Sequence, residues 1–217
     1  MTLAEENYIK AVYHLESKYE NGVPTNALAD KMKTKASSVT DMVKKLAEKG
    51  LLVYKPYQGA FLSEKGRSHA IMVIRRHRLW EQFLVEKLNF NWDEVHDLAE
   101  QLEHIESDKL INELDAFLDF PTHDPHGDPI PDRHGQIQRT DKIMLSQGVC
   151  NIGYQCVGVN DSTPNFLKYL DKNCIGIGTK ILVKDIEEFD QSMTIKINDK
   201  TLVMSKAITS NIYVKKI

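Results

Sequence analysis

The sequence is poor in cysteine, and its few cysteines carry no recognisable spacing. The 217 residues include only Cys150, Cys156 and Cys174. An odd number without a Cys-x-x-Cys pair argues against a disulfide framework and against a thiolate zinc site. Reduced cysteines are the simplest interpretation, and they predict a cytoplasmic protein.

The sequence also shows no long apolar run and no pattern typical of a signal peptide. No apolar stretch approaches the roughly 20 residues that a membrane helix needs. The segment MTLAEENYIKAVYHLE is acidic and amphipathic, without the basic-then-apolar order of a signal peptide. Hydrophobic content of 41% and charged content of 27% are ordinary for a soluble globular protein. We therefore expect no membrane partner.

Charge is distributed unevenly along the chain. Residues 1–78 hold 14 Lys and Arg against 8 Asp and Glu, a net charge of +6. The remaining 139 residues hold 14 against 23, a net charge of −9. A basic first part joined to an acidic remainder suggests a polyanionic partner for the first part only. Random variation of charge along the chain is the alternative.

The order of elements expected in the first part is that of a winged helix-turn-helix. Apolar spacing predicts a helix from Leu3 to Tyr19 and a short helix through Met32, with Thr25 as N-cap. A second helix is expected to begin near Ser37 and to end before Gly50, since glycine is the usual residue at the C′ position after a helix. Two strand-like runs around PYQG then read as a hairpin. We expect this segment to bind double-stranded DNA.

Small hydroxyl side chains and lysines at the start of the second helix are the expected DNA contacts. Ser and Thr can reach base edges or phosphates, and lysines neutralise phosphates. Backbone N–H groups at the start of the preceding helix could also hold a phosphate. The candidates are Thr25, Asn26, Lys35, Ser37, Ser38, Thr40 and Lys44. The competing interpretation makes Ser37 or Ser38 only an N-cap. Tyr57 and Gln58 at the hairpin tip could contact the DNA backbone.

Further along, two long helices are followed by a change of composition. Ser63 can cap a helix from about Glu64 to Leu88, and another is expected from about Trp92 to Phe120. The stretch DFPTHDPHGDPIPDRHG holds four of the seven prolines and marks a linker. Short β-rich runs then suggest a small barrel or sandwich. The predicted fold is a mainly α amino-terminal part with a small all-β domain, divided into residues 1–75, 76–137 and 138–217.

Histidine and glutamate recur at helical spacing in the two long helices. Offsets of i, i+4, i+7 and i+8 bring side chains to one helix face. The residues concerned are His77, Glu81, His96, Glu100, Glu103 and His104. Neighbouring carboxylates repel unless a cation offsets them, and imidazole with carboxylate suits Mn²⁺, Fe²⁺, Co²⁺ or Zn²⁺. The alternative is an exposed helix face. We interpret His123, His126 and His134 as solvated linker residues.

Several stretches together resemble a known family. EENYIKAVYHL, SSVTDMVKKLAEKGLL, LSEKGR, RRHRLWEQFL, VHDLAEQLEHIESD and PHGDPIP run in one order across residues 1–131. The chain is similar to metal-dependent transcriptional regulators of the diphtheria toxin repressor family, in their three-domain form with an SH3-like carboxy-terminal domain. The resemblance implies a homodimer that binds palindromic operator DNA and represses genes of manganese or iron uptake.

The resemblance also implies how the ligands divide. One site would use Asn7, Glu100, Glu103 and His104, and another His77, Glu81 and His96. Glu100 in place of cysteine favours Mn²⁺ over Fe²⁺, with Zn²⁺ or Co²⁺ able to bind in vitro. Asn7 removes one negative charge, and Lys10 stands where some two-metal members have a carboxylate. Metal would then link the first helix to the dimerisation helices and set the spacing of the winged domains.

Two other functions compete with this interpretation. A metallohydrolase could use the same side chains, but the sequence has no His-Glu-x-x-His and no separate general base. A winged-helix regulator that senses an organic ligand would leave the His and Glu stripe as mere surface. We therefore expect a regulator and not an enzyme.

Overall fold

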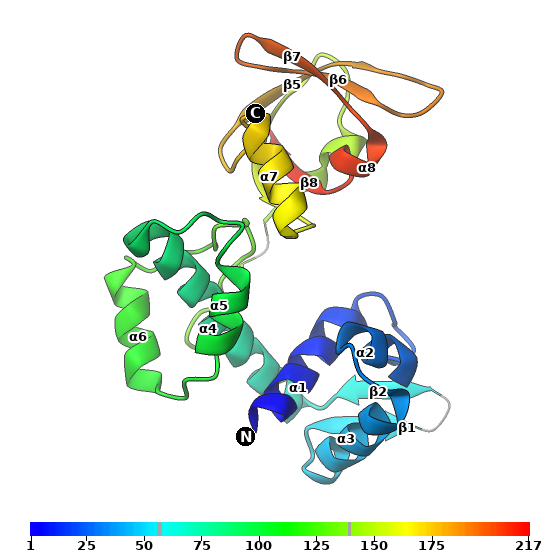
Figure 1. Cartoon of the computed structure of the whole chain (residues 1–217), viewed down its shortest axis with the longest axis vertical. Helices are drawn as coiled ribbons and strands as arrows, with labels where there is room; N and C mark the ends of the chain where they lie inside the picture. Colours follow the sequence, from blue (N-terminus) through cyan, green and yellow to red (C-terminus); the bar gives the residue numbers. More distant parts are fainter. Residues whose placement is uncertain (56–57, 139) are drawn as a thin grey trace. The chain divides into compact units, whose positions relative to one another are not determined.

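The computed structural model describes residues 1–55, 58–138 and 140–217, so Tyr57 of the predicted hairpin tip lies outside the described residues. Figure 1 labels the helices and strands along the chain. The described residues form two compact units. The first comprises residues 1–77, 100–112 and 131–136, and the second residues 78–99, 113–130 and 137–217. Across these ranges, none of the helices has both the length and the apolar character needed to cross a membrane.

The first unit contains the predicted winged helix-turn-helix. Its elements are α1 (Leu3–Glu16), α2 (Thr25–Lys31), α3 (Ala36–Glu48), β1 (Leu52–Lys55) and β2 (Gly59–Leu62). The two strands pair antiparallel to form the wing. One apolar side of each helix is buried in a common core that includes Ile9, Leu28, Val39, Val43 and Leu46. This core fixes which face of α3 is left for a partner.

Two helix starts differ from the sequence prediction. Pro24, not Thr25, is the N-cap of α2, because its φ of −64° and ψ of 144° already give the extended cap geometry. Lys35 is the N-cap of α3, so neither Ser37 nor Ser38 serves as a cap. The predicted end of α3 is confirmed, since Gly50 follows it with a φ of +68°.

The expected long helix α4 (Glu64–Leu88) is present, and Ser63 caps it by accepting a hydrogen bond from the Gly66 N–H at 2.9 Å. The prediction of a single helix from Trp92 to Phe120 is wrong. The chain forms α5 (His96–Leu102) and α6 (Asp108–Phe117) instead. Ser107 starts α6, since its side chain accepts from the Leu110 N–H at 3.3 Å and its carbonyl from the Ile111 N–H.

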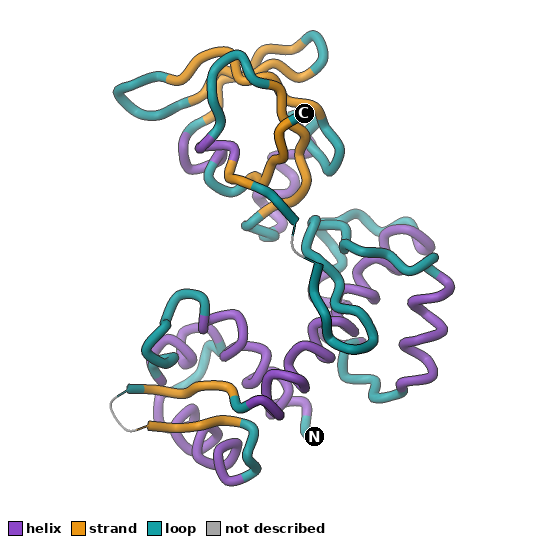
Figure 2. Tube along the Cα trace, turned by 180° about the vertical axis from the view of Figure 1, so that it is seen from behind, coloured by secondary structure: helices purple, strands orange, loops and turns teal. Residues whose placement is uncertain are grey.

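The carboxy-terminal part is a six-stranded antiparallel sheet in the order β3-β8-β4-β5-β6-β7. In Figure 2 strands gather in this sheet and in the wing hairpin. The elements are β3 (Ile143–Met144), η1 (Leu145–Gln147), β4 (Gly153–Val159), α7 (Pro164–Lys172), β5 (Lys180–Ile186), β6 (Met193–Ile197), β7 (Lys200–Met204), α8 (Lys206–Thr209) and β8 (Ile212–Lys216). The predicted fold class is confirmed. Helix α7 was not predicted, and its Leu167 and Leu170 are buried in the core of this domain.

Candidate metal centre and nucleic-acid interface

Three ionisable side chains meet in the interior of the second unit. Glu81 comes from α4, while Asp124 and His126 come from the proline-rich linker. Each is at most 6% exposed. One ligand atom from each lies within 4.8 Å of the others, close enough to share one metal ion. Two carboxylates and an imidazole are ligands that first-row divalent ions accept.

His126 is held in place by its neighbours, and its interpretation as a solvated linker residue is wrong. Its Nε2 lies 2.8 Å from the backbone carbonyl oxygen of Trp92, and its ring stacks on the Trp92 indole. Because Nε2 donates to that carbonyl, Nδ1 is the nitrogen that faces Glu81, 3.5 Å from Oε2. Of the other linker histidines, His134 is exposed as expected.

Asp124 and Gly127 shape the linker around the site. The Oδ1 of Asp124 accepts the backbone N–H groups of His126 and Asp128, at 2.8 and 3.0 Å. Gly127 has a φ of +80°, and a Cβ there would lie 2.1 Å from the carbonyl oxygen of Val157 in β4. Only glycine permits this approach without strain. The Val159 N–H donates to the His126 carbonyl at 2.9 Å, so β4 supports the loop that carries two candidate ligands.

Burial and mutual charge perturb both linker residues. Burial, together with the charges of Glu81 and Asp128, raises the pKa of Asp124 to about 7. Burial alone would lower the pKa of His126, but its hydrogen bond to Glu81 and the charges of Glu81 and Asp124 raise it to about 9. Such strong coupling between buried groups is typical of a functional site. The excess of carboxylate over imidazole suits a divalent cation.

Glu81 also lies beside two of the predicted ligands. Its Oε1 is 3.4 Å from Nδ1 of His96, and His77 precedes it by one turn of the continuous helix α4. The His96 side chain is 48% exposed. The assignment of His77, Glu81 and His96 as one ligand set stays a prediction. Glu81 belongs to both candidate groups.

The other predicted ligand set, Asn7, Glu100, Glu103 and His104, includes side chains that form ion pairs with other residues of the chain. Both carboxylate oxygens of Glu103 contact the Lys10 ammonium, at 2.6 and 2.8 Å. Nδ1 of His104 lies 2.5 Å from Oε2 of Glu6, the neighbour of Asn7. An ammonium group already faces the Glu100 and Glu103 carboxylates, so these residues do not fit a divalent ion as they lie here. Their assignment as ligands stays a prediction.

The candidate DNA contacts lie along α3 and in the first turn of α2. Lys35, Ser37, Ser38 and Lys44 are exposed, as is Asn26 on α2, whereas Thr25 is half-buried. The Thr40 hydroxyl donates to the Ala36 carbonyl at 2.9 Å, which ties it to its own helix.

Two lysines near the end of α3 have a role that the sequence did not predict. Lys45 and Lys49 contact the buried carboxylate of Glu5 at 3.0 and 2.7 Å. Hydrogen bonds from Lys49 and Lys45 lower the pKa of Glu5 to about 2. These contacts attach α3 to α1, so the orientation of the candidate DNA-reading helix depends on α1.

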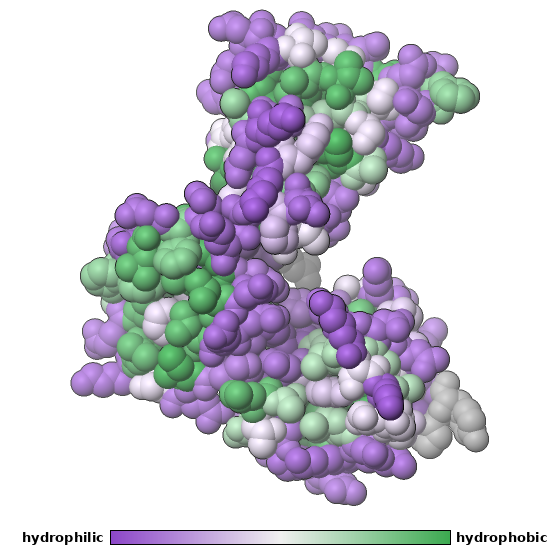
Figure 3. Space-filling view, viewed as in Figure 1, coloured by the Kyte–Doolittle hydropathy of each residue, from purple (hydrophilic) through white to green (hydrophobic). Residues whose placement is uncertain are grey.

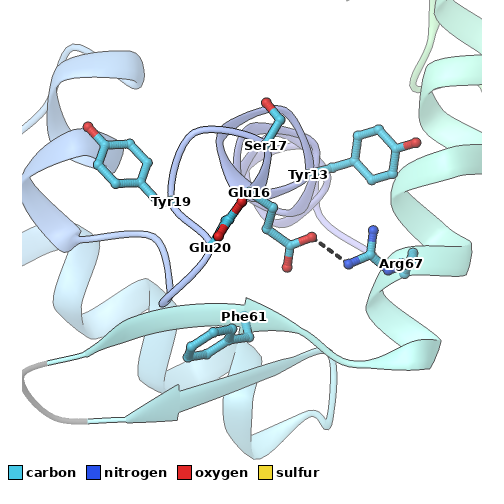
Figure 4. Close-up of a pocket in the computed structure, with 7 residues that line it drawn as sticks. All are labelled: Tyr13, Glu16, Ser17, Tyr19, Glu20, Phe61 and Arg67. Carbon is cyan, nitrogen blue, oxygen red and sulfur yellow. Dashed lines mark hydrogen bonds and ion pairs between the residues drawn. The ribbon is translucent and has the colours of Figure 1, made fainter.

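A surface hollow of about 580 Å³ lies where α1 ends against the wing and the start of α4 (Figure 4). Glu16 crosses it, with its Oε2 2.5 Å from the Arg67 guanidinium and its Oε1 accepting the Leu62 N–H at 2.9 Å. Arg67 also lies over the Tyr13 ring. These contacts hold the wing at a fixed place beside α1 and α4.

Known proteins match the chain in the same order of parts. The model "Iron dependent repressor, N-terminal DNA binding domain" matches residues 1–60, and "Iron dependent repressor, metal binding and dimerisation domain" matches residues 63–132. A FeoA domain matches residues 153–216. A solved manganese-dependent transcriptional repressor, in complex with manganese, is 32% identical, with a TM-score of 0.87 over 98% of this chain and 100% of that one. The chain belongs to the iron-dependent repressor family, which includes the diphtheria toxin repressor.

Two further members of the iron-dependent repressor family support the assignment. The solved manganese regulator SloR is 33% identical, with a TM-score of 0.78 over the full length of both chains. The iron-dependent repressor IdeR of Mycobacterium tuberculosis is 38% identical over 128 residues, 58% of this chain. The match spans about half, 54%, of that curated relative. The family matches follow the predicted order of three domains, whose bounds stay predictions.

Proposed function

We propose that this chain is a divalent-metal-dependent transcriptional repressor that binds operator DNA of manganese or iron uptake genes. The observation that carries the proposal is the buried group of Glu81, Asp124 and His126. Its ligand atoms converge within 4.8 Å, in the same chain as a helix α3 whose Lys35, Ser37 and Ser38 are exposed. When bound, a divalent ion would neutralise the carboxylates of this group. The proposal places the protein in the cytoplasm, together with the DNA.

The donor set favours Mn²⁺ as the cofactor, with Fe²⁺ as the alternative. Carboxylate and imidazole donors without a thiolate suit harder divalent ions, while Zn²⁺ and Co²⁺ would also bind such a set in vitro. The similar solved repressors are described as manganese-dependent, and IdeR as iron-dependent. His96, whose Nδ1 lies 3.4 Å from Oε1 of Glu81, and His77, one turn before Glu81 on α4, are proposed as further ligands.

In the proposal, α3 reads double-stranded DNA. Its exposed Ser37 and Ser38 would approach base edges, while Lys35 and Lys44 would neutralise phosphates. Asn26 and Thr25 in the first turn of α2 would add backbone contacts. A dimer would bring two such helices to the half-sites of a palindrome.

An exposed apolar surface supports the proposed homodimer. Around α4, α5 and α6 the visible face carries hydrophobic side chains (Figure 3). Phe117 and Phe120 are 63% and 64% exposed, and Leu88 is 51% exposed. Large exposed apolar patches mark interaction sites, and a second copy of the chain is the commonest partner. This surface is where we place the two-fold interface.

The test is fluorescence anisotropy of a palindromic promoter duplex, titrated with the full chain at fixed salt. Binding is measured with chelator and then with Mn²⁺, anaerobic Fe²⁺ or Zn²⁺. We expect metal to tighten DNA binding, with Mn²⁺ acting at a lower free concentration than Fe²⁺. The opposite order would make iron the signal.

Variants connect this response to the buried group. Glu81→Gln and His126→Ala should each abolish the tightening of DNA binding by metal. The DNA affinity measured in chelator should stay unchanged in both variants. His134→Ala, in an exposed part of the same linker, is the matched control. Equal DNA binding in chelator and in every metal would refute the proposal.

A further inference from the structure

The ammonium group of Lys10 lies among the predicted metal ligands at the end of α5. The side chain of Lys10 is only 12% exposed, and its Nζ lies 2.6 and 2.8 Å from the two oxygens of Glu103. The same ammonium is 3.6 Å from Oε1 of Glu100. Glu103 is fully buried. One lysine therefore neutralises a pair of carboxylates that would otherwise attract a divalent ion.

The remaining charges around this cluster are also balanced by protein groups. Glu6 is buried, and its Oε1 accepts from the Arg76 guanidinium at 2.8 Å. The His77 Nδ1 lies 2.6 Å from Oε2 of Glu103. Burial of Glu103 is outweighed by His77 and Lys10, which lower the pKa of its carboxyl. The cluster is thus a closed network of ion pairs within the first unit.

A divalent ion entering this network would meet two obstacles. It would have to displace the Lys10 ammonium from Glu103, because a divalent cation and an ammonium within a few ångströms repel strongly. It would also find a neutral amide at Asn7, where a carboxylate would supply more attraction. At the Glu81, Asp124 and His126 group, the Arg78 guanidinium lies 3.5 Å from Oδ2 of Asp124, farther than the 2.6 and 2.8 Å that separate the Lys10 ammonium from the two oxygens of Glu103.

We propose that Lys10 is a built-in counter-ion that closes the Asn7, Glu100, Glu103 and His104 set to metal. Each subunit would then take up one divalent ion tightly, at the Glu81, Asp124 and His126 group; this part rests on the proposed function. Lys10 itself joins α1 to the segment after α5. Lys10 thus makes, without metal, a link between α1 and this segment that the resemblance assigned to metal.

The experiment is a titration of the full chain with Mn²⁺ alone, with free Mn²⁺ followed by electron paramagnetic resonance. We expect one tight ion per wild-type chain. Lys10→Met keeps the length of the side chain and removes its charge, and we expect it to bind a second ion at least tenfold more tightly than wild type does. Lys18→Met, exposed just beyond α1, is the matched control and should retain one tight ion.

Two further variants separate this inference from the proposed function. Glu81→Gln should bind no tight ion, and Glu81→Gln with Lys10→Met should bind one. Two equally tight ions in the wild-type chain would overturn the inference without any variant, so a misfolded Lys10→Met protein could not hide its failure. An ion retained by Glu81→Gln but lost by Glu103→Gln would overturn it as well. No ion in wild type and one in Lys10→Met would refute the proposed metal group yet support the role of Lys10.

Discussion

Replacing Gly127 by alanine tests whether β4 positions the loop of the proposed metal site. The added Cβ would lie 2.1 Å from the Val157 carbonyl oxygen and 2.5 Å from Cα of Gly158. Real Cβ contacts are essentially never shorter than 3.0 Å, so the loop must move by about 0.9 Å or more. Since His126 is the preceding residue, that movement displaces a candidate ligand.

The magnitude follows from two losses. An alanine at the φ of +80° costs about 1–2 kcal/mol relative to glycine. Loss of the hydrogen bond from the Val159 N–H to the His126 carbonyl costs about 1 kcal/mol. If only the docked loop binds metal, a total of about 2–3 kcal/mol weakens binding by roughly 30- to 150-fold.

The assay is isothermal titration of wild type and Gly127→Ala with Mn²⁺ at one pH. Gly176→Ala is the matched control, because a Cβ there meets no atom within 4 Å. A Kd for Gly127→Ala within threefold of the wild-type value would refute the role assigned to β4.

Three other predictions follow from contacts described above. The pKa of Asp124 is raised to about 7 and that of His126 to about 9, so a metal ion must displace protons from these groups. The affinity for Mn²⁺ should therefore rise between pH 6 and pH 9. Heats of Mn²⁺ titration that do not depend on the ionisation enthalpy of the buffer would contradict this prediction. Lys44→Gln should lower the salt-dependence slope of DNA binding by about 1, whereas Lys200→Gln in the carboxy-terminal sheet should leave it unchanged. Ser63→Ala removes the cap of α4 and should lower the free energy of unfolding by about 1 kcal/mol in urea; an unchanged denaturation midpoint would contradict it.

Local patterns in the sequence predicted the elements that are built from local interactions. The order of helices and hairpin, the end of α3 at Gly50 and the cap of α4 at Ser63 all depend on neighbouring residues. The break between α5 and α6 was missed because apolar spacing continues through it. Ser107 was the available signal in the sequence, since serine is strongly preferred at the N-cap of a helix. The Thr-Pro start of α7 was a similar signal, hidden among strand-like runs.

The candidate ligands predicted from the sequence all lie on or beside helices, where spacing along the chain indicates which side chains share a face. His77 and Glu81 are one turn apart on α4, so helical spacing indicated their proximity. Asp124 and His126 reach Glu81 through a loop whose path depends on Trp92 and on β4, far away in sequence. Periodicity carries no information about such contacts. The same limit hid the pairing of Lys10 with Glu103, which are 93 residues apart.

Internal ion pairs change what the basic charge of the first 78 residues means. At least six of its 14 basic side chains are committed to carboxylates of this chain, namely Lys10, Lys45, Lys49, Arg67, Arg76 and Arg78. Each such pair leaves one fewer cationic side chain to neutralise a phosphate, so binding releases fewer of the counterions condensed on the polyanion. The chain should therefore bind bulk DNA or heparin more weakly than its composition suggests. A larger share of its operator affinity then rests on base-specific contacts, which widens the margin between the operator and the rest of the chromosome.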